Sequence, residues 1–168
     1  MKNYYDKDKT YSYKAVFYST VLAVLILLFT SLISCSVIEE PEPEIELKQV
    51  DKEYFMEVIS LMRKDTIRWC DTLEKGSAIQ TDHMEQTGEF AHVWSDGTGP
   101  YERLKSVGYT GYSGECIAWG QEDERTVLEA WMFSDGHRKT IMDKNINCIG
   151  VTRSKSGKYW TLVTGRMQ

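Results

Sequence analysis

Two short, mostly apolar runs near the C-terminus constrain the fold of this chain most strongly. The runs "CIGVTR" at 148–153 and "KYWTLVTG" at 158–165 are separated only by "SKSG", a short turn that includes Gly157. Short runs rich in β-branched and aromatic residues are typical of strands, and so short a connection joins antiparallel neighbours. A third strand is expected at 114–119. The sequence therefore predicts an antiparallel sheet that forms late in the chain.

Helical patterns occupy most of the chain before and between these strands. The expected helices are 54–63, 66–84, 100–107 and 124–133. Pro100 stands at a first helical position and Gly108 where a helix would end, while the small residues Gly76, Ser77 and Ala78 would let another element approach closely. Helices that come first and strands that come late favour an antiparallel sheet covered by helices. We expect an α+β fold in a single domain, 54–168.

The N-terminal part of the chain is of a different kind. A basic flank that ends at Lys14 precedes an apolar stretch from Ala15 to Ile33, which is the layout of a secretory signal. The stretch closes on "LISC", which resembles the bacterial lipobox. Residues 1–34 are therefore predicted to be a lipoprotein-type signal peptide, and Cys35 to carry the lipid. The alternative is an uncleaved helix, because the stretch is near the length that spans a bilayer.

A tether is expected between this signal and the domain. Residues 35–53 contain Pro41, Pro43 and a run of glutamates, which disfavour both a helix and a packed core. Whether the signal is cleaved or not, the domain is held at a membrane, in the cell envelope and outside the cytoplasm.

The charge of the chain argues against one class of partner. Lys and Arg together number 20 and Asp and Glu number 25, which gives a net charge of -5. The basic flank lies in the signal, so the remainder is more acidic still. Because phosphate binding depends on clustered Lys and Arg, no nucleic acid partner is expected.

Four cysteines are present, at positions 35, 70, 116 and 148. If Cys35 carries lipid, three remain in an exported domain, so one stays unpaired or pairs between molecules. A disulfide between Cys116 and Cys148 is one pairing that the sequence allows, since both lie on expected strands. The sequence alone leaves the pairing open.

The candidates for chemistry are His92, Glu115 and His137. The chain has three histidines and lacks the "HExxH", "GxSxG" and Gly-rich phosphate-loop motifs. Ser134 is expected to cap the helix that follows it, which places His137 near the positive end of the helix dipole. That environment favours the neutral imidazole, the form that binds a metal or accepts a proton. His83 has polar neighbours and is expected to be a solvated helix residue without a role.

Glu115 stands in the apolar run "GECIAWG" at 114–120. Successive side chains of a strand point to opposite faces, so if Glu115 faces a cleft, Cys116 faces the other way into packing. This alternation argues against a Cys–His nucleophile built on Cys116.

Four segments together resemble a known family. The segments "FAHVWSDGTGPYERLKSVGY", "GECIAWG", "EAWMFSDGHRKTIM" and "CIGVTRSKSGKYWTLV" are similar in order and spacing to the CAP superfamily, also called the SCP or cysteine-rich secretory, antigen 5 and pathogenesis-related 1 family. The short bacterial branch matches best, over roughly residues 55–166. The resemblance implies an α-β-α sandwich with a central, mainly three-stranded antiparallel sheet and a cleft in which two histidines and two acids commonly converge.

The resemblance also implies roles for particular residues. The cleft histidines fall on His92 and His137 and the strand acid on Glu115, whereas the second acid falls on Ser134, and Cys116 replaces the asparagine of the family's "GEN" motif. Two histidines and one carboxylate match the ligand count of catalytic zinc sites. The resemblance implies that the two histidines bind a divalent metal such as zinc, and that the acid holds a water or orients a histidine ring.

Three functions follow as hypotheses. The first is a membrane-anchored binding module whose cleft holds a divalent metal or a small ligand. The second is a metal-dependent hydrolase of peptide or cell-envelope material with Glu115 as general base, against which the missing second acid counts. The third is a lipid-binding or structural surface protein that uses aromatic residues, namely Tyr101, Tyr109, Tyr112 and Trp119. The expected partners are the membrane, through the lipid anchor, and a small ligand, lipid or envelope component.

Overall fold

The computed structural model describes residues 45–167, so the predicted signal peptide, Cys35 and most of the predicted tether lie outside the described residues. The elements in chain order are β1 (Leu47–Lys48), α2 (Lys52–Arg63), β2 (Arg68–Trp69), α3 (Asp71–Thr87), α4 (Pro100–Ser106), β3 (Ser113–Trp119), α5 (Glu124–Phe133), α6 (Asp135–Ile141), β4 (Cys148–Ser154) and β5 (Tyr159–Gly165). In this part of the chain, no helix has the length and apolar character needed to cross a membrane.

The sheet has the strand order β1-β4-β5-β3, and its three long strands are the predicted ones. β4 and β5 form the expected antiparallel hairpin, with Gly157 in the left-handed region at φ 81° in the turn. β3 pairs antiparallel with β5, so that Glu115 lies opposite Val163. The short β1 pairs antiparallel and the short β2 parallel with β4. The prediction of an α+β fold around an antiparallel sheet is confirmed.

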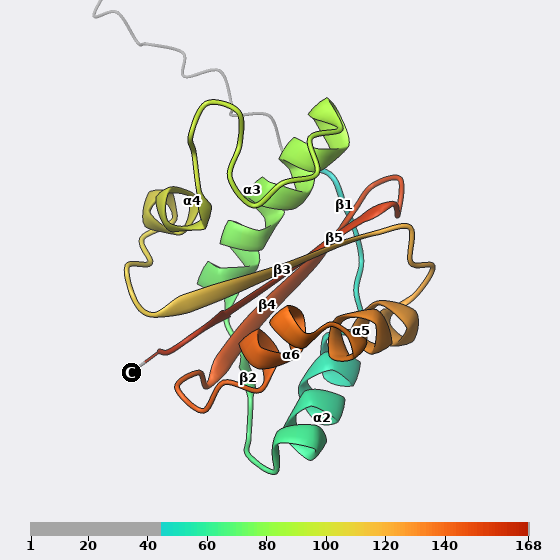
Figure 1. The fold of residues 1–168 in the computed structure, drawn as a ribbon, viewed down its shortest axis with the longest axis vertical. Coiled ribbons are helices and arrows are strands. Elements are labelled where there is room, and N and C mark those ends of the chain that lie inside the picture. The colour runs from blue at the N-terminus through green and yellow to red at the C-terminus, as the bar shows by residue number, and fades with distance from the viewer. Residues whose placement is uncertain (1–44, 168) are drawn as a thin grey trace, which may run out of the picture. The chain divides into compact units, whose positions relative to one another are not determined.

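Helices cover both faces of this sheet, as Figure 1 shows. On one face, α2, α5 and α6 contribute Phe55, Trp131 and Ile141 to a core cluster that includes Trp160 and Leu162 of β5. On the other face, α3 and α4 pack through a second cluster. The three-layer α-β-α arrangement implied by the family resemblance is therefore present.

Two predicted boundaries are wrong. The predicted helix 66–84 begins only at Asp71, because Arg68 and Trp69 form β2 beside β4 instead. The predicted tether extends too far, because β1 pairs with β4, Val50 is buried, and α2 already begins at Lys52. The backbone pairing that recruits these segments joins residues far apart in sequence, so local composition does not reveal it.

Glycines bring α3 close to its neighbours. A Cβ atom on Gly150 of β4 would lie 2.1 Å from the backbone nitrogen of Glu74, so the α3 backbone rests directly on the strand. A Cβ atom on Gly76 would lie 2.5 Å from Cδ2 of Leu104 in α4. The expectation that the small residues of the second helix admit a close neighbour is confirmed.

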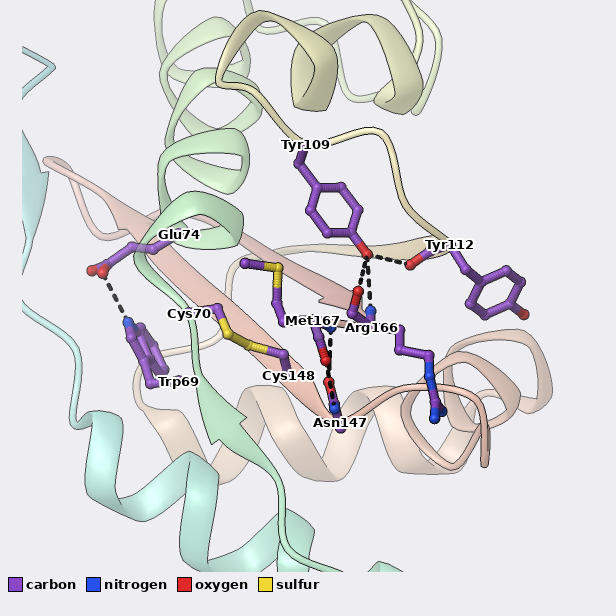
Figure 2. Close-up of a disulfide and its surroundings, with 9 residues drawn as sticks. All are labelled: Trp69, Cys70, Glu74, Tyr109, Tyr112, Asn147, Cys148, Arg166 and Met167. Carbon is purple, nitrogen blue, oxygen red and sulfur yellow. Dashed lines mark hydrogen bonds between the residues drawn. A yellow bond between two sulfur atoms is a disulfide. The ribbon is translucent and has the colours of Figure 1, made fainter.

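A disulfide joins Cys70, just before α3, to Cys148 at the start of β4, with the Cα atoms 5.9 Å apart (Figure 2). The pairing of Cys116 with Cys148, which the sequence left open as one possibility, is not formed. β5 lies between the strands that carry these two residues, and Cys116 belongs to the core cluster on the opposite face of the sheet from Cys148. The two strand spacings between β3 and β4 together exceed the Cα–Cα distance that a disulfide can bridge. Among the described residues, Cys116 is the free cysteine and is buried.

Candidate functional site

The alternation of β3 sends Glu115 and Cys116 to opposite faces of the sheet, as predicted. Cys116 is fully buried in the cluster formed with α2 and α5, where its Sγ lies 3.9 Å from the carbonyl oxygen of His137. Burial raises the pKa of the Cys116 thiol well above its usual range, and the nearby Glu115 carboxylate raises it further. A thiol in this environment is unreactive, so Cys116 is a packing residue and not a nucleophile.

Glu115 lies on the other face and binds two partners. Its Oε1 is 2.9 Å from Nδ1 of His92, and Nη2 of Arg103 donates to Oε2 at 2.8 Å and to Oε1 at 3.1 Å. The Glu115 side chain is only 4% exposed. Bonds of this kind between charged partners are the strong ones in proteins, so the carboxylate is held in a fixed position.

The carboxylate fixes the tautomer of His92. A carboxylate paired with arginine is an acceptor only, so Nδ1 of His92 is the donor in their hydrogen bond. When the ring is neutral, Nε2 of His92 therefore carries the free lone pair. The His92 side chain is 47% exposed, which leaves the ring accessible to a ligand.

Arg103 is the residue of this site that the sequence reasoning missed. Its side chain is 1% exposed, and besides Glu115 it donates to the backbone carbonyls of Thr98 at 3.2 Å and His92 at 3.0 Å. Its guanidinium also lies 5.0 Å from the ring centroid of Trp94. Arg103 thus ties the strand acid to the loop that carries His92.

A signal for Arg103 was present in the sequence. Positions 100, 103, 104 and 107 follow the helical spacing of a buried stripe, and Arg103 stands in it beside Leu104. Both residues are buried on the inner face of α4. A charged residue within an apolar stripe indicates a buried partner of opposite charge.

The loop between α3 and α4 is held in place by a second set of contacts. Nε1 of Trp94 donates to Oε1 of the buried Gln80 at 2.7 Å, and Nε2 of Gln80 donates to the carbonyl of Ala91 at 2.9 Å. His83 stacks on Trp94 with ring centroids 3.8 Å apart, and its Nε2 lies 3.0 Å from Glu89. The expectation that His83 is simply solvated is wrong, because it supports the Trp94 ring from α3.

His137 approaches from the other helical layer, on α6. The residue is partly buried, and burial, followed by the nearby charge of His92, lowers its pKa below the ordinary value of 6.5. Ser134 occupies the predicted N-cap position of α6, but its side chain makes no capping hydrogen bond. The expected side-chain cap is therefore not formed.

Comparison with known proteins identifies the family. The family model for CAP, the cysteine-rich secretory protein family, matches residues 61–165. The chain belongs to the CAP family.

Two curated relatives of this CAP chain come from Bacillus subtilis. It is 37% identical over 92 residues to the uncharacterized protein YkwD of Bacillus subtilis, and 26% identical over 97 residues to the uncharacterized membrane protein YlbC of the same organism. These alignments take in 54% and 56% of this chain, but only 36% and 27% of the two relatives. The chain thus spans about a third of the length of these curated relatives.

Solved structures share the CAP fold. An outer surface protein of Borrelia burgdorferi superposes with a TM-score of 0.61 at 20% identity, covering 73% of this chain and 100% of that one. An extracellular protein of Bacillus anthracis that contains an SCP domain superposes with a TM-score of 0.62 at 20% identity, covering 68% of this chain and 40% of that one. Identities this low establish the fold alone.

Glu115 is already engaged by its neighbours in the CAP site. Among residues 45–167, no group of three or more His, Cys, Asp or Glu side chains gathers in a metal-binding arrangement. Both oxygens of Glu115 are bonded to Arg103 or His92. If the site takes a metal, His92 and His137 are the side chains left to hold it, with Glu115 orienting the His92 ring.

Proposed function

We propose that this chain is an extracytoplasmic, membrane-anchored CAP protein whose site binds a divalent metal or a small electron-poor ligand through His92 and His137. The observation that carries the proposal is the hydrogen bond from His92 Nδ1 to Glu115, which is itself held by Arg103. This arrangement presents His92 Nε2 in a fixed direction. The lowered pKa of His137 keeps the second imidazole neutral at neutral pH.

Each residue of the site has a distinct part in this function. His92 and His137 would hold the ligand, and a bound zinc ion would supply a Lewis-acid centre. Glu115 orients the His92 ring, and Arg103 holds the Glu115 carboxylate in place. Ser134 lies next to α6 but adds no acid, so the site lacks the second carboxylate of many CAP proteins.

Placement outside the cytoplasm has independent support. The Cys70–Cys148 disulfide suits an oxidising compartment. Similar structures are named as an outer surface protein and an extracellular protein. The lipobox-like "LISC" and the preceding apolar stretch supply the proposed anchor at Cys35.

Two other functions receive less support. Hydrolysis with Glu115 as general base would need a carboxylate oxygen free to take a proton from water, whereas Glu115 is 4% exposed and bonded through both oxygens. Lipid binding through Tyr101, Tyr109, Tyr112 and Trp119 receives less support because Tyr109 is only 5% exposed. Its hydroxyl donates to the carbonyl of Tyr112 at 2.6 Å and accepts from the backbone nitrogen of Arg166 at 2.8 Å (Figure 2).

A zinc titration of the full-length protein in lipid nanodiscs, in which calorimetry measures binding, tests the proposal. We expect one saturable site in the wild type, and binding at least roughly tenfold weaker in both His92→Ala and His137→Ala. Arg125→Gln, an exposed change on α5 outside the contacts that hold the site, is the control and should bind like the wild type. Equal zinc affinity in all four proteins would reject the two-imidazole site.

A further inference from the structure

A cavity at the end of β3 is lined by none of the residues on which the proposed function rests. It has a volume of about 300 Å³ and is lined by Gly88, Phe90, Trp119, Lys158 and Tyr159. The loop after α3 supplies the first two residues and the end of β3 supplies Trp119, while Lys158 immediately precedes β5 and Tyr159 is its first residue. Three aromatic rings and one ammonium group thus meet in a single hollow.

The rings in this cavity are displayed to solvent rather than packed. Phe90 is 49% exposed and Trp119 is 56% exposed, while Tyr159 is buried beneath them as the floor. The rings of Phe90 and Tyr159 have centroids 6.5 Å apart and planes inclined by 27°. Leaving large apolar surfaces in water costs free energy in proportion to their area, so two exposed rings at one hollow indicate a ligand that covers them.

Lys158 gives the cavity a positive charge. Its Nζ lies 5.4 Å from the ring centroid of Trp119 and 4.9 Å from that of Tyr159. In the part of the chain that the structure describes, Lys158 forms no ion pair with a carboxylate. Burial alone would raise the pKa of the nearby Glu85 carboxylate, but hydrogen bonds from Ser156 and the charge of Lys158 help to lower it. Because Lys158 and Glu85 form no ion pair, the ammonium group can still bind an anionic group on a ligand.

The combination of flat rings and one cation points to a sugar. The faces of aromatic rings carry partial negative charge, which attracts the weakly positive C–H groups of a pyranose ring. A carboxylate on the sugar would pair with the ammonium group of Lys158. A membrane surface would instead favour a cluster of basic residues, and the domain is acidic overall.

We propose that the cavity formed by Phe90, Trp119, Lys158 and Tyr159 is a carbohydrate-binding subsite that takes a pyranose ring bearing a carboxylate. The cavity also shares strand β3 with the candidate site. Trp119 and Glu115 lie on the same face of β3, four residues or about 13 Å apart. Phe90 precedes His92 by two residues in one loop. An acidic oligosaccharide bound at the aromatic rings would therefore run toward the imidazoles.

Saturation-transfer NMR on the full-length protein in lipid nanodiscs tests the subsite with a matched pair of sugars. N-acetylmuramic acid carries a carboxylate on its lactyl group, and N-acetylglucosamine lacks that group. We expect saturable binding of the acidic sugar, and weaker binding of the neutral one. Trp119→Ala should weaken binding of the acidic sugar roughly tenfold. Lys158→Gln should reduce the preference for the acidic sugar and leave the neutral one unchanged.

Two controls separate this subsite from the imidazole site and from general stickiness. Phe133→Ala removes an aromatic ring that is 87% exposed on α5, in the opposite helical layer, and should leave sugar binding unchanged. His92→Ala should also retain sugar binding, so failure of the metal proposal would not affect this test. The proposal would be overturned if no saturable sugar binding were seen, or if Trp119→Ala bound the acidic sugar as well as the wild type does. A response of Phe90, Trp119, Lys158 and Tyr159 to lipid alone would also overturn it.

Discussion

Arg103 donates to both carboxylate oxygens of Glu115, at 2.8 Å and 3.1 Å, and both side chains are almost completely buried. The pair joins α4 to β3 and, through the same guanidinium, to the loop that carries His92. A buried charge that loses its partner is strongly destabilising, so this ion pair governs both the stability and the geometry of the site.

Replacing Arg103 by methionine should lower the free energy of unfolding by about 3–5 kcal/mol, because Glu115 would remain buried and unpaired. Urea unfolding checks the value. The double variant Arg103→Met/Glu115→Gln should be less unstable than the sum of the single variants, since the two residues are in direct contact. Arg125→Met, which breaks an exposed pair with Glu129 on α5, should leave the free energy of unfolding nearly unchanged, because solvent screens that pair. A similar loss of unfolding free energy in Arg103→Met and Arg125→Met would contradict the claim that the buried ion pair stabilises the domain more than the exposed one.

The pKa of His137 should lie below 6.5 in the metal-free protein, because burial disfavours its charged form. In the His92→Ala variant this pKa should rise, since a neighbouring positive charge is lost, but it should stay below 6.5 because burial is the larger cause. The depressed value has a consequence for stability. His137 stabilises the folded state above the unfolded pKa, and this contribution is lost as the pH falls through the folded pKa. NMR titration of the imidazole C–H signals measures both proteins, and a pKa of His137 above 6.5 in either would contradict the geometry.

Peptide mapping without reduction should recover a fragment that links Cys70 to Cys148, and a mass increase of about two hydrogens should follow reduction. Cys116 should resist alkylation until the protein is unfolded, because its thiol is fully buried. Replacing Cys70 and Cys148 by serine should cost about 4 kcal/mol, as expected for a loop of this length. A fragment linking Cys116 to either partner would be incompatible with the sheet order.

Gly150→Ala should destabilise the domain by about 3 kcal/mol, because the added methyl group would collide with the backbone of α3 at Glu74. Gly136→Ala on α6 is the matched control, since no atom lies within 4 Å of the added Cβ. That change should be neutral or stabilising by about 1 kcal/mol or less. Thermal unfolding of the two variants measures the difference, and equal midpoints would show that α3 does not rest on β4 as described.

Features set by local pattern were predicted well from the sequence. The bounds of α5 match the expected helix, the three long strands lie where their apolar runs and the hairpin turn placed them, and Glu115 and Cys116 occupy opposite faces of β3. Each of these depends on the periodicity of a few consecutive residues, which the sequence displays directly.

Features set by contacts between distant segments were not predicted. The partner of Cys148 depends on β5 lying between β3 and β4, and β2 exists only because Arg68 and Trp69 pair with β4. Arg103 was assigned to an ordinary helix, although its place in the apolar stripe indicated burial. Its bond to Glu115 required the fold of α4 over β3, which no local pattern specifies.

Two-bond proton–nitrogen NMR correlation of the imidazoles, recorded on the full-length protein before and after zinc is added, tests the central claim most directly. The account predicts that His92 carries its proton on Nδ1 before zinc is added, and that Nε2 of His92 and one ring nitrogen of His137 shift when zinc binds. A His92 ring protonated on Nε2 in the zinc-free neutral state, or signals of both histidines that zinc leaves unchanged, would contradict it.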